Sequence, residues 1–326
     1  MKKLISIDYM RALSAIYIVA FWHLMEYVKS IPEHVYKNIW TGTITVSILG
    51  LFVFISGYLT GGRKGQSLSP LDFYRKRLMR IYPLYALAIY LFYLYGINGS
   101  KTSLISLFGL SMYYGSKPIT LWFITMIVVF YLLAPFFLKL ADRPLQYFAA
   151  VSGVYTASVL MYMAFGTVDI RLLLYLPCFA AGLFCSIHGI VNRIFNLKTM
   201  MLVFGMGLPL MQLESGMLAP SRLGRVPIIL SLAYLTFYLF YRNETLFRSN
   251  RLITFLSYGS FAMYLFHRPI YSTLTDWYLP EGNWQQLLYM IAIFAVFVTS
   301  ISWCLQKAYD VILSVTSKPK QSATGA

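Results

Sequence analysis

Apolar residues along this chain gather into ten long runs that are separated by short polar segments. The runs cover residues 5–28, 41–60, 81–97, 119–138, 146–165, 171–187, 199–213, 226–241, 252–272 and 284–306. A helix crosses a bilayer with about 20 mostly apolar residues. The pattern therefore predicts an all-α integral membrane protein, a bundle of about ten transmembrane helices, with a short extra helix near 102–115.

The composition agrees with this class. Hydrophobic residues make up 59% of the chain and charged residues 12%, against about 25% charged residues in a soluble domain. The net charge of +16 would suggest nucleic acid in a soluble protein, but the basic residues here lie mostly in short loops. In that position they set the orientation in the membrane and contact anionic lipids. The sequence has no nucleic-acid-binding motif, so no nucleic-acid partner is expected.

The distribution of basic residues predicts the orientation. If the run at 102–115 stays at the outer face, the basic loops 63–80 and 242–251 share one side with both termini. The positive-inside rule makes that side cytoplasmic. We therefore expect a single transmembrane domain over 1–313 and a disordered cytoplasmic tail over 314–326. The oligomeric state does not follow from the sequence.

The cysteines do not indicate disulfides or a metal site. Cys178, Cys185 and Cys304 all lie in apolar runs, and their odd number argues against a disulfide framework. No cluster of cysteine and histidine has the spacing of zinc ligands. No metal is therefore expected.

The first apolar run carries four ionisable residues, Asp8, Arg11, His23 and Glu26. An aspartate or arginine at the centre of a spanning helix costs at least about 2.5 kcal/mol, so such groups mark pairing, a wet cavity or chemistry. A neutral imidazole beside a carboxylate is a common general base, and Glu26 lies one turn from His23. A buried histidine satisfied by a hydrogen bond explains His23 equally well.

A second candidate is the basic segment with Arg75, Arg77 and Arg80. It is typical of a positive-inside signal at the membrane surface. It also fits an anion clamp, because Arg77 and Arg80 are three positions apart and would share one face of a helix. Guanidinium groups bind phosphates bidentately, so a nucleotide or coenzyme A would suit them.

Three further residues allow two interpretations each. Ser56 and the adjacent Gly57 indicate either close helix packing or a bend. Trp122 is typical of a membrane-interface aromatic, but it could also shape a ligand site. His267 lies near the outer end of a span, where it forms either an interfacial polar group or part of a site.

Four segments and one aromatic position carry a resemblance. Residues 8–13 read D-Y-M-R-A-L, 51–59 read L-F-V-F-I-S-G-Y-L, 75–83 read R-K-R-L-M-R-I-Y-P and 258–269 read Y-G-S-F-A-M-Y-L-F-H-R-P; Trp122 begins an aromatic pair between them. In this order they resemble the acyltransferase 3 family of multi-pass membrane acyltransferases. The resemblance covers most of the chain.

The resemblance implies an O-acetyltransferase of a bacterial-type cytoplasmic (inner) membrane. Acetyl-CoA would be the cytoplasmic donor, and a hydroxyl of a surface polysaccharide or lipid-linked sugar would be the acceptor. The candidate site residues fall into three groups: His23, Arg11 and Glu26 for catalysis, Arg75, Arg77, Arg80, Ser56 and Tyr82 for the donor, and Asp8, Trp122 and His267 for the acceptor. Glu26 is included because it lies one turn from His23, and the others because of their place in the resemblance. A transporter or flippase of glycans, succinyl transfer, and a purely structural membrane partner remain alternatives.

The first motif departs from the family pattern, which has one residue fewer between its arginine and histidine. Here eleven residues, 12–22, separate Arg11 from His23. In an ideal helix this places His23 about 120° away from Arg11 instead of about 20°. A one-residue π-bulge would restore the face, and such bulges favour functional sites. We predict such a distortion; a straight helix with His23 facing lipid would refute it.

Overall fold

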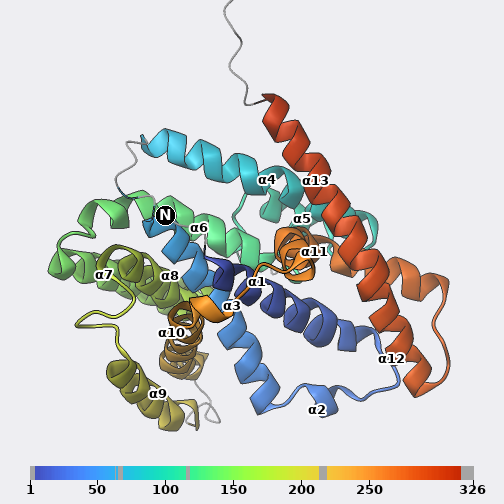
Figure 1. Ribbon diagram of the computed structural model, residues 1–326, viewed down its shortest axis with the longest axis horizontal. Helices are drawn as coiled ribbons and strands as arrows, with labels where there is room; N and C mark the ends of the chain where they lie inside the picture. The colour runs from blue at the N-terminus through green and yellow to red at the C-terminus, as the bar shows by residue number, and fades with distance from the viewer. Residues whose placement is uncertain (1–3, 63, 65–68, 115–117, 213–218, 317–326) are drawn as a thin grey trace, which may run out of the picture.

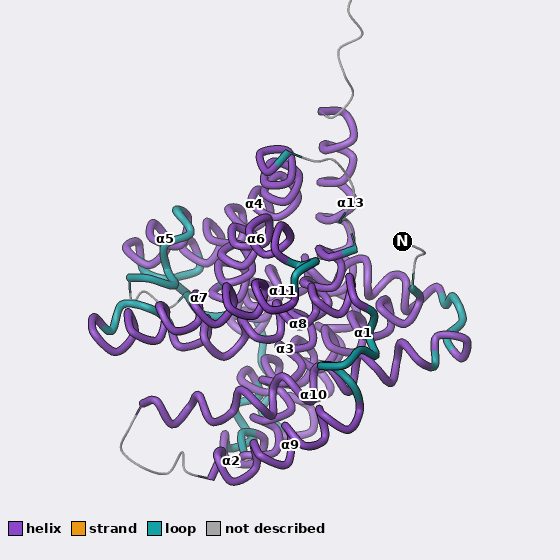
Figure 2. The backbone as a smooth tube through the Cα atoms, turned by 90° about the vertical axis from the view of Figure 1, so that its left-hand side faces the viewer, coloured by secondary structure: helices purple, strands orange, loops and turns teal. Residues whose placement is uncertain are grey.

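The computed structural model describes residues 4–62, 64, 69–114, 118–212 and 219–316, and every regular element in these ranges is a helix (Figures 1 and 2). The predicted all-α membrane fold is confirmed. Seven segments of the described chain are long and apolar enough to cross a membrane: Ile5–Tyr27, Ile39–Gly61, Trp122–Leu140, Pro144–Phe165, Ile170–His188, Arg222–Arg242 and Asn283–Val315. The count of about ten spans remains a prediction.

The first segment contains the predicted distortion. It begins as α1 (Ile5–Ala15), continues as the π-helix η1 (Ile16–His23) and ends as the 3-10 helix η2 (Leu24–Tyr27). A π-helix bonds residue i to i+5, so it absorbs one extra residue without breaking the helix. His23 lies at its end and is only 8% exposed.

The two following helices lead back across the bundle. The short α2 (Glu33–Tyr36) is followed by α3 (Ile39–Gly61), which starts at a cap in which the Asn38 side chain accepts the N–H groups of Trp40 and Thr41. An asparagine in this position satisfies backbone donors that the first turn leaves open.

α3 packs most extensively against α8 (Ile170–His188), and glycines allow the contact. A Cβ atom at Gly57 would lie 2.1 Å from the carbonyl oxygen of Phe179, and one at Gly182 would lie 2.1 Å from that of Phe54. Small residues let membrane helices approach to backbone contact. The interpretation of Gly57 as a close-packing residue is confirmed, and this contact fixes the neighbouring Ser56.

α4 (Pro70–Leu94) includes the whole arginine segment. It starts at Ser69, whose hydroxyl accepts the N–H of Asp72, so the arginines are helical and not part of a loop. Further along, the hydroxyl of Tyr85 donates to the carbonyl of Ser106 at 3.2 Å in α5 (Ser100–Leu107). α5 is the extra helix that was expected near 102–115, but it ends at Leu107.

The other helices complete the bundle: α6 (Trp122–Leu140), α7 (Pro144–Phe165), α9 (Leu197–Gln212), η4 (Ala219–Arg225), α10 (Val226–Arg242), η5 (Glu244–Leu246), α11 (Arg251–Trp277), α12 (Asn283–Ala292), the π-helix η6 (Ile293–Val298) and α13 (Thr299–Thr316). α13 projects beside α4 in both views (Figures 1 and 2). It is helical through Thr316, so the expected tail does not begin at Ser314. Residues 317–326 lie outside the described ranges.

α1 is fixed against α11 and the loop before it. The carboxylate of Glu244 accepts the backbone N–H groups of Ile5 at 2.6 Å and Ser6 at 3.1 Å, which caps the first turn of α1. The hydroxyl of Ser257 donates to the carboxylate of Asp8 at 2.9 Å. These contacts set the depth and rotation of α1, and hence the direction of Arg11.

Candidate active site

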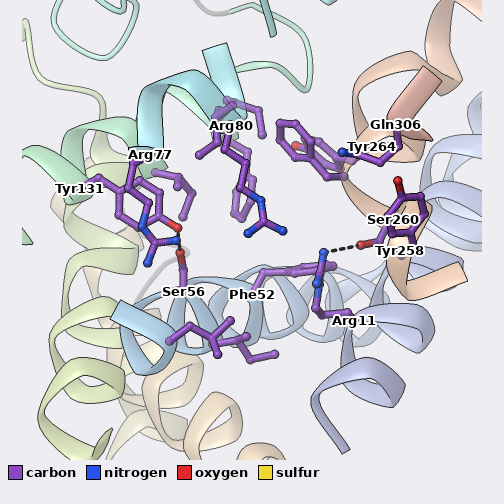
Figure 3. A pocket seen from close by; sticks show the side chains of 18 of the residues that line it. Arg11, Phe52, Ser56, Arg77, Arg80, Tyr131, Tyr258, Ser260, Tyr264 and Gln306 are labelled. Carbon is purple, nitrogen blue, oxygen red and sulfur yellow. Dashed lines mark hydrogen bonds between the residues drawn. The ribbon is translucent and has the colours of Figure 1, made fainter. Parts of the chain in front are cut away.

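Side chains from seven helical elements, α1, η1, α3, α4, α6, α11 and α13, line a cavity of about 260 Å³ (Figure 3). Its polar lining residues are Arg11, Ser56, Arg77, Arg80, Tyr131, Tyr258, Ser260, Tyr264, Gln306 and Asp310. The rest of the lining is apolar, with Phe52 and Phe123 among it. A mostly apolar pocket with a few convergent polar groups is the usual form of a ligand site.

Two of the three arginines in the cavity come from α4. Arg77 and Arg80 both line it, as their spacing of three predicts. Arg77 donates to the hydroxyl of Thr60 at 3.2 Å, and its guanidinium carbon lies 4.7 Å from the centre of the Tyr131 ring. Its Nε is buried and has no hydrogen-bond partner in the described part of the chain, so Arg77 retains a donor for an anion.

The third arginine, Arg11, reaches the cavity from α1. Its Nη2 donates to the hydroxyl oxygen of Ser260 at 3.1 Å, while that hydroxyl donates to the carbonyl of Ser257 at 2.7 Å. In Figure 3 the guanidinium groups of Arg11 and Arg80 point toward one another across the cavity. Among the lining residues three cations thus face a single carboxylate, Asp310, and this balance attracts an anionic ligand.

Ser56 meets the arginine side of the cavity from α3. Its hydroxyl lies 2.5 Å from that of Tyr131, in a hydrogen bond in which either oxygen can donate. Since Tyr131 also carries the guanidinium of Arg77 over its ring, Ser56 helps to orient this arginine.

A pair of buried histidines lies next to the cavity. The rings of His23 and His267 are stacked, with centroids 4.8 Å apart and planes 6° from parallel. His267 is fully buried, and its Nδ1 lies 3.0 Å from the carbonyl oxygens of Met263 and Tyr264. Because carbonyls only accept, Nδ1 carries the hydrogen and Nε2 is an acceptor. His23 is buried against the bundle, so the predicted π-helical distortion is confirmed, but the ring lies beside the cavity and does not line it as Arg11 does.

Tyr264 separates the histidine pair from the cavity. It lines the cavity, and its ring centroid lies 6.4 Å from that of His23 and 6.1 Å from that of His267. Its hydroxyl donates to the carbonyl of Thr120 at 2.7 Å, and its ring contacts Phe123. Thr120 has a φ of 57°, the only left-handed non-glycine backbone in the described residues.

Two predicted donor-site residues lie elsewhere. Arg75 is exposed and is not in the cavity lining, because two positions along a helix turn the side chain about 200° away from Arg77. Tyr82 donates its hydroxyl to the carbonyl of Leu107 and so holds α5 against α4. Neither residue lines the cavity, and their expected role at the donor stays a prediction.

Three other predicted site residues have structural partners. Glu26 does not bond His23 in the described structure; it accepts from Arg268 at 2.6 Å and lies 3.3 Å from Lys37. Asp8 accepts the hydroxyl of Ser257 and does not line the cavity. Trp122 is also outside the lining, and the guanidinium carbon of Arg171 lies 4.1 Å from its ring centre.

Several lining residues were missed by the sequence analysis. Tyr258, Ser260 and Tyr264 lie inside the motif that contains His267, so the motif itself was a signal for them. Gln306 and Asp310 lie four apart near the end of the last apolar run, where the only signal is a polar pair at helical spacing.

The family model of the acyltransferase domain matches residues 4–307, nearly the whole chain. The chain belongs to the acyltransferase 3 family. It is a membrane acyltransferase, and the matched range holds every cavity-lining residue except Asp310. Neither the comparison with curated proteins nor that with solved structures gives a match.

Proposed function

We propose that this acyltransferase moves an acetyl group from cytoplasmic acetyl-CoA to a hydroxyl of a surface or exported glycan, either a polysaccharide or a lipid-linked sugar. One arrangement carries the proposal: three arginines converge on a single cavity, and a buried histidine pair lies directly behind the Tyr264 wall. The first suits phosphates and the second suits a proton transfer.

The donor fits the arginine side of the cavity. Coenzyme A carries several phosphate groups, and guanidinium groups bind phosphate oxygens through paired hydrogen bonds. The buried Nε of Arg77 has no partner within the ranges that the structure describes, and Arg80 projects into the centre of the cavity (Figure 3). We assign these two residues, with Arg11, to the donor phosphates.

His23 is the proposed general base. It would take the proton of the acceptor hydroxyl while the acceptor oxygen bonds to the acyl carbon, and the bond from that carbon to sulfur breaks. The thiolate that leaves then takes up a proton to give free coenzyme A. Stacking on His267 holds the His23 ring, and the carbonyls of α11 fix the orientation of His267 in turn.

The spacing of the two groups along the first segment suits a long donor. Arg11 and His23 are twelve positions apart, which is at most about 18 Å at the α-helical rise of 1.5 Å per residue, since the π-helical turn Ile16–His23 rises less. The flexible arm of coenzyme A would bridge from the arginines toward the histidines, past Tyr264. We place the acceptor on the far side of His23, at the outer membrane face.

The test uses purified full-length protein in lipid nanodiscs, with acetyl-CoA and isolated glycan, and mass spectrometry of the product. We expect His23→Ala to lower acetyl transfer by at least about 100-fold while coenzyme A still binds. Exposed His34 provides the matched control, and His34→Ala is expected to leave transfer unchanged. Unaltered transfer in His23→Ala would overturn the role of His23.

Binding measurements separate the remaining alternatives. Arg77→Gln and Arg80→Gln are each expected to weaken coenzyme A binding by about tenfold or more, because a charged hydrogen bond is lost. A wild-type protein that binds no coenzyme A but moves a lipid-linked sugar across the membrane would be a transporter. Acetyl-CoA and succinyl-CoA assayed side by side identify the acyl group.

A further inference from the structure

The side of the cavity formed by α13 differs chemically from its arginine side. Gln306 and Asp310 lie one turn apart on α13, and Nε2 of Gln306 donates to Oδ1 of Asp310 at 3.1 Å. The hydroxyl of Tyr258 donates to Oδ2 of the same carboxylate at 2.5 Å. Gln306 and Arg77 lie on opposite sides of the cavity in Figure 3. A group of hydrogen-bond acceptors therefore faces a group of guanidinium donors.

Gln306 presents an unused acceptor. The side chain is only 7% exposed, and its Oε1 is buried without a hydrogen-bond partner among the described residues. Because the carboxylate of Asp310 only accepts, the amide nitrogen must face it and Oε1 must face away from it. A buried carbonyl without a partner is unfavourable, so this oxygen is suited to an N–H or O–H group that enters the cavity.

Asp310 can also accept further hydrogen bonds. A carboxylate accepts about four hydrogen bonds, and the described contacts of Asp310 are those with Tyr258 and Gln306. Within the described residues it forms no ion pair with Arg11, Arg77 or Arg80, although all four line the same cavity. Its hydrogen-bond partners in the described residues, Tyr258 and Gln306, are thus both neutral side chains.

The position of this acceptor group is fixed relative to the arginines. The hydroxyl of Tyr309 on α13 donates to the carbonyl of Met79 on α4, in the turn between Arg77 and Arg80. A ligand held by the arginines therefore meets Gln306 and Asp310 at a defined distance. Such a ligand needs an anionic part and, beside it, hydrogen-bond donors such as N–H groups.

We propose that Gln306 and Asp310 form a second subsite of the donor cavity, which accepts hydrogen bonds from N–H groups of the donor while the arginines hold its phosphates. This inference rests on the proposed use of a coenzyme A thioester. Coenzyme A carries such N–H groups in two places, the amides of its pantetheine arm and the amine of its adenine. Simple phosphates carry none, so the subsite selects the nucleotide thioester over them.

Asp310→Asn tests the subsite, because it should change the affinities for coenzyme A and for pyrophosphate in opposite directions or change only the first. The measurement is calorimetric binding of coenzyme A and of pyrophosphate to full-length protein in nanodiscs. We expect coenzyme A to bind about tenfold more weakly or worse, because a hydrogen bond to a charged acceptor is lost. Pyrophosphate should bind equally or more tightly, because a negative charge has left an anion site. Equal or tighter coenzyme A binding would overturn the proposal.

Gln306→Leu removes the neutral acceptor. Coenzyme A binding should weaken about fivefold, with pyrophosphate binding unchanged. The matched control for Asp310→Asn is Asp142→Asn, which makes the same charge change at an exposed loop residue outside the cavity. This control should alter neither affinity, and an equal loss in it would assign the effect to net charge and contradict the subsite.

Two fragments locate the N–H groups. Adenosine bisphosphate has the adenine amine without the amides, and phosphopantetheine has the amides without the adenine. If Asp310→Asn weakens the binding of one fragment, that fragment carries the N–H group from which this carboxylate accepts a hydrogen bond. A wild-type protein that binds no coenzyme A would refute the proposed donor itself, whereas wild-type binding with an unaffected Asp310→Asn refutes the subsite alone.

Discussion

The first and the last described segments of the bundle each contain a π-helical turn, η1 (Ile16–His23) and η6 (Ile293–Val298), and both turns lie against α11. In the first, buried Ile18 is followed five positions later by buried His23. In the last, Ile293 is followed five positions later by Val298. Five is the hydrogen-bonding step of a π-helix. One extra residue is thus absorbed while the buried face continues.

The two π turns differ in the residues that they position. η1 ends on the histidine that stacks against His267. η6 contains only apolar residues, but the face that it carries forward reaches Gln306 and then Asp310 in α13. In both segments the π turn therefore sets the rotation of the residues that follow it. In the first segment it orients the proposed base, His23, and in the last it orients Gln306 and Asp310 of the proposed donor subsite.

The largest expected effect comes from changing the length of η1. Insertion of one alanine between Ala20 and Phe21 turns the histidine by about 100° relative to Arg11. We expect acyl transfer to fall by about 100-fold or more, measured with purified protein whose coenzyme A binding is intact. Deletion of Ala20 restores the family spacing, which places the histidine about 20° from Arg11, and should leave most of the activity. Equal losses in both variants would contradict a register role.

The sequence could predict the π turn η1, because few backbone structures can accommodate one extra residue between Arg11 and His23 within a continuous helix. It also predicted that Arg77 and Arg80 share a face, since that follows from helical spacing alone. It could not predict the partner of Glu26, because Arg268 lies 242 positions away in the chain. Gln306 and Asp310 were missed for the same reason, as only the packing of α13 beside α4 brings them to the arginines.

A matching insertion in η6 should have a different and smaller effect. One alanine between Ala295 and Val296 rotates α13 and moves Gln306 and Asp310 off the cavity. We expect KM for acetyl-CoA to rise on the order of tenfold, with kcat at saturating donor nearly unchanged. Steady-state kinetics separate the two constants. A fall in kcat as large as that from the insertion in η1 would show that the two turns do not have separate tasks.

A third variant asks whether Glu26 serves stability or catalysis. Glu26 is 24% exposed and its partner Arg268 11% exposed, so the ion pair is partly shielded from water. Glu26→Gln leaves that guanidinium without its carboxylate, and we expect a loss of about 1–2 kcal/mol, less than for a fully buried pair. Thermal unfolding in detergent measures it.

The control for this variant is Glu33→Gln. Glu33 is the other carboxylate bound to Lys37, is exposed, and should contribute little to stability. The pH profile of acyl transfer should be the same in both variants and in the wild type. A profile that shifts only in Glu26→Gln would restore the expected role of Glu26 in orienting His23.

The smallest expected effect, on the unfolding temperature, comes from the helix caps at which the first and last segments begin. The carboxylate of Glu244 caps α1, whereas α12 begins at Gly282 without a side-chain cap. A carboxylate at a helix N-terminus contributes about 0.3–1 kcal/mol, so Glu244→Gln should lower the unfolding temperature slightly. Glu281→Gln, just before α12, should lower it less, because Glu281 makes no such cap. If both changes are equal, the cap does not fix α1, and other contacts, such as the bonds of Asp8 to Ser257 and of Arg11 to Ser260, set the direction of Arg11.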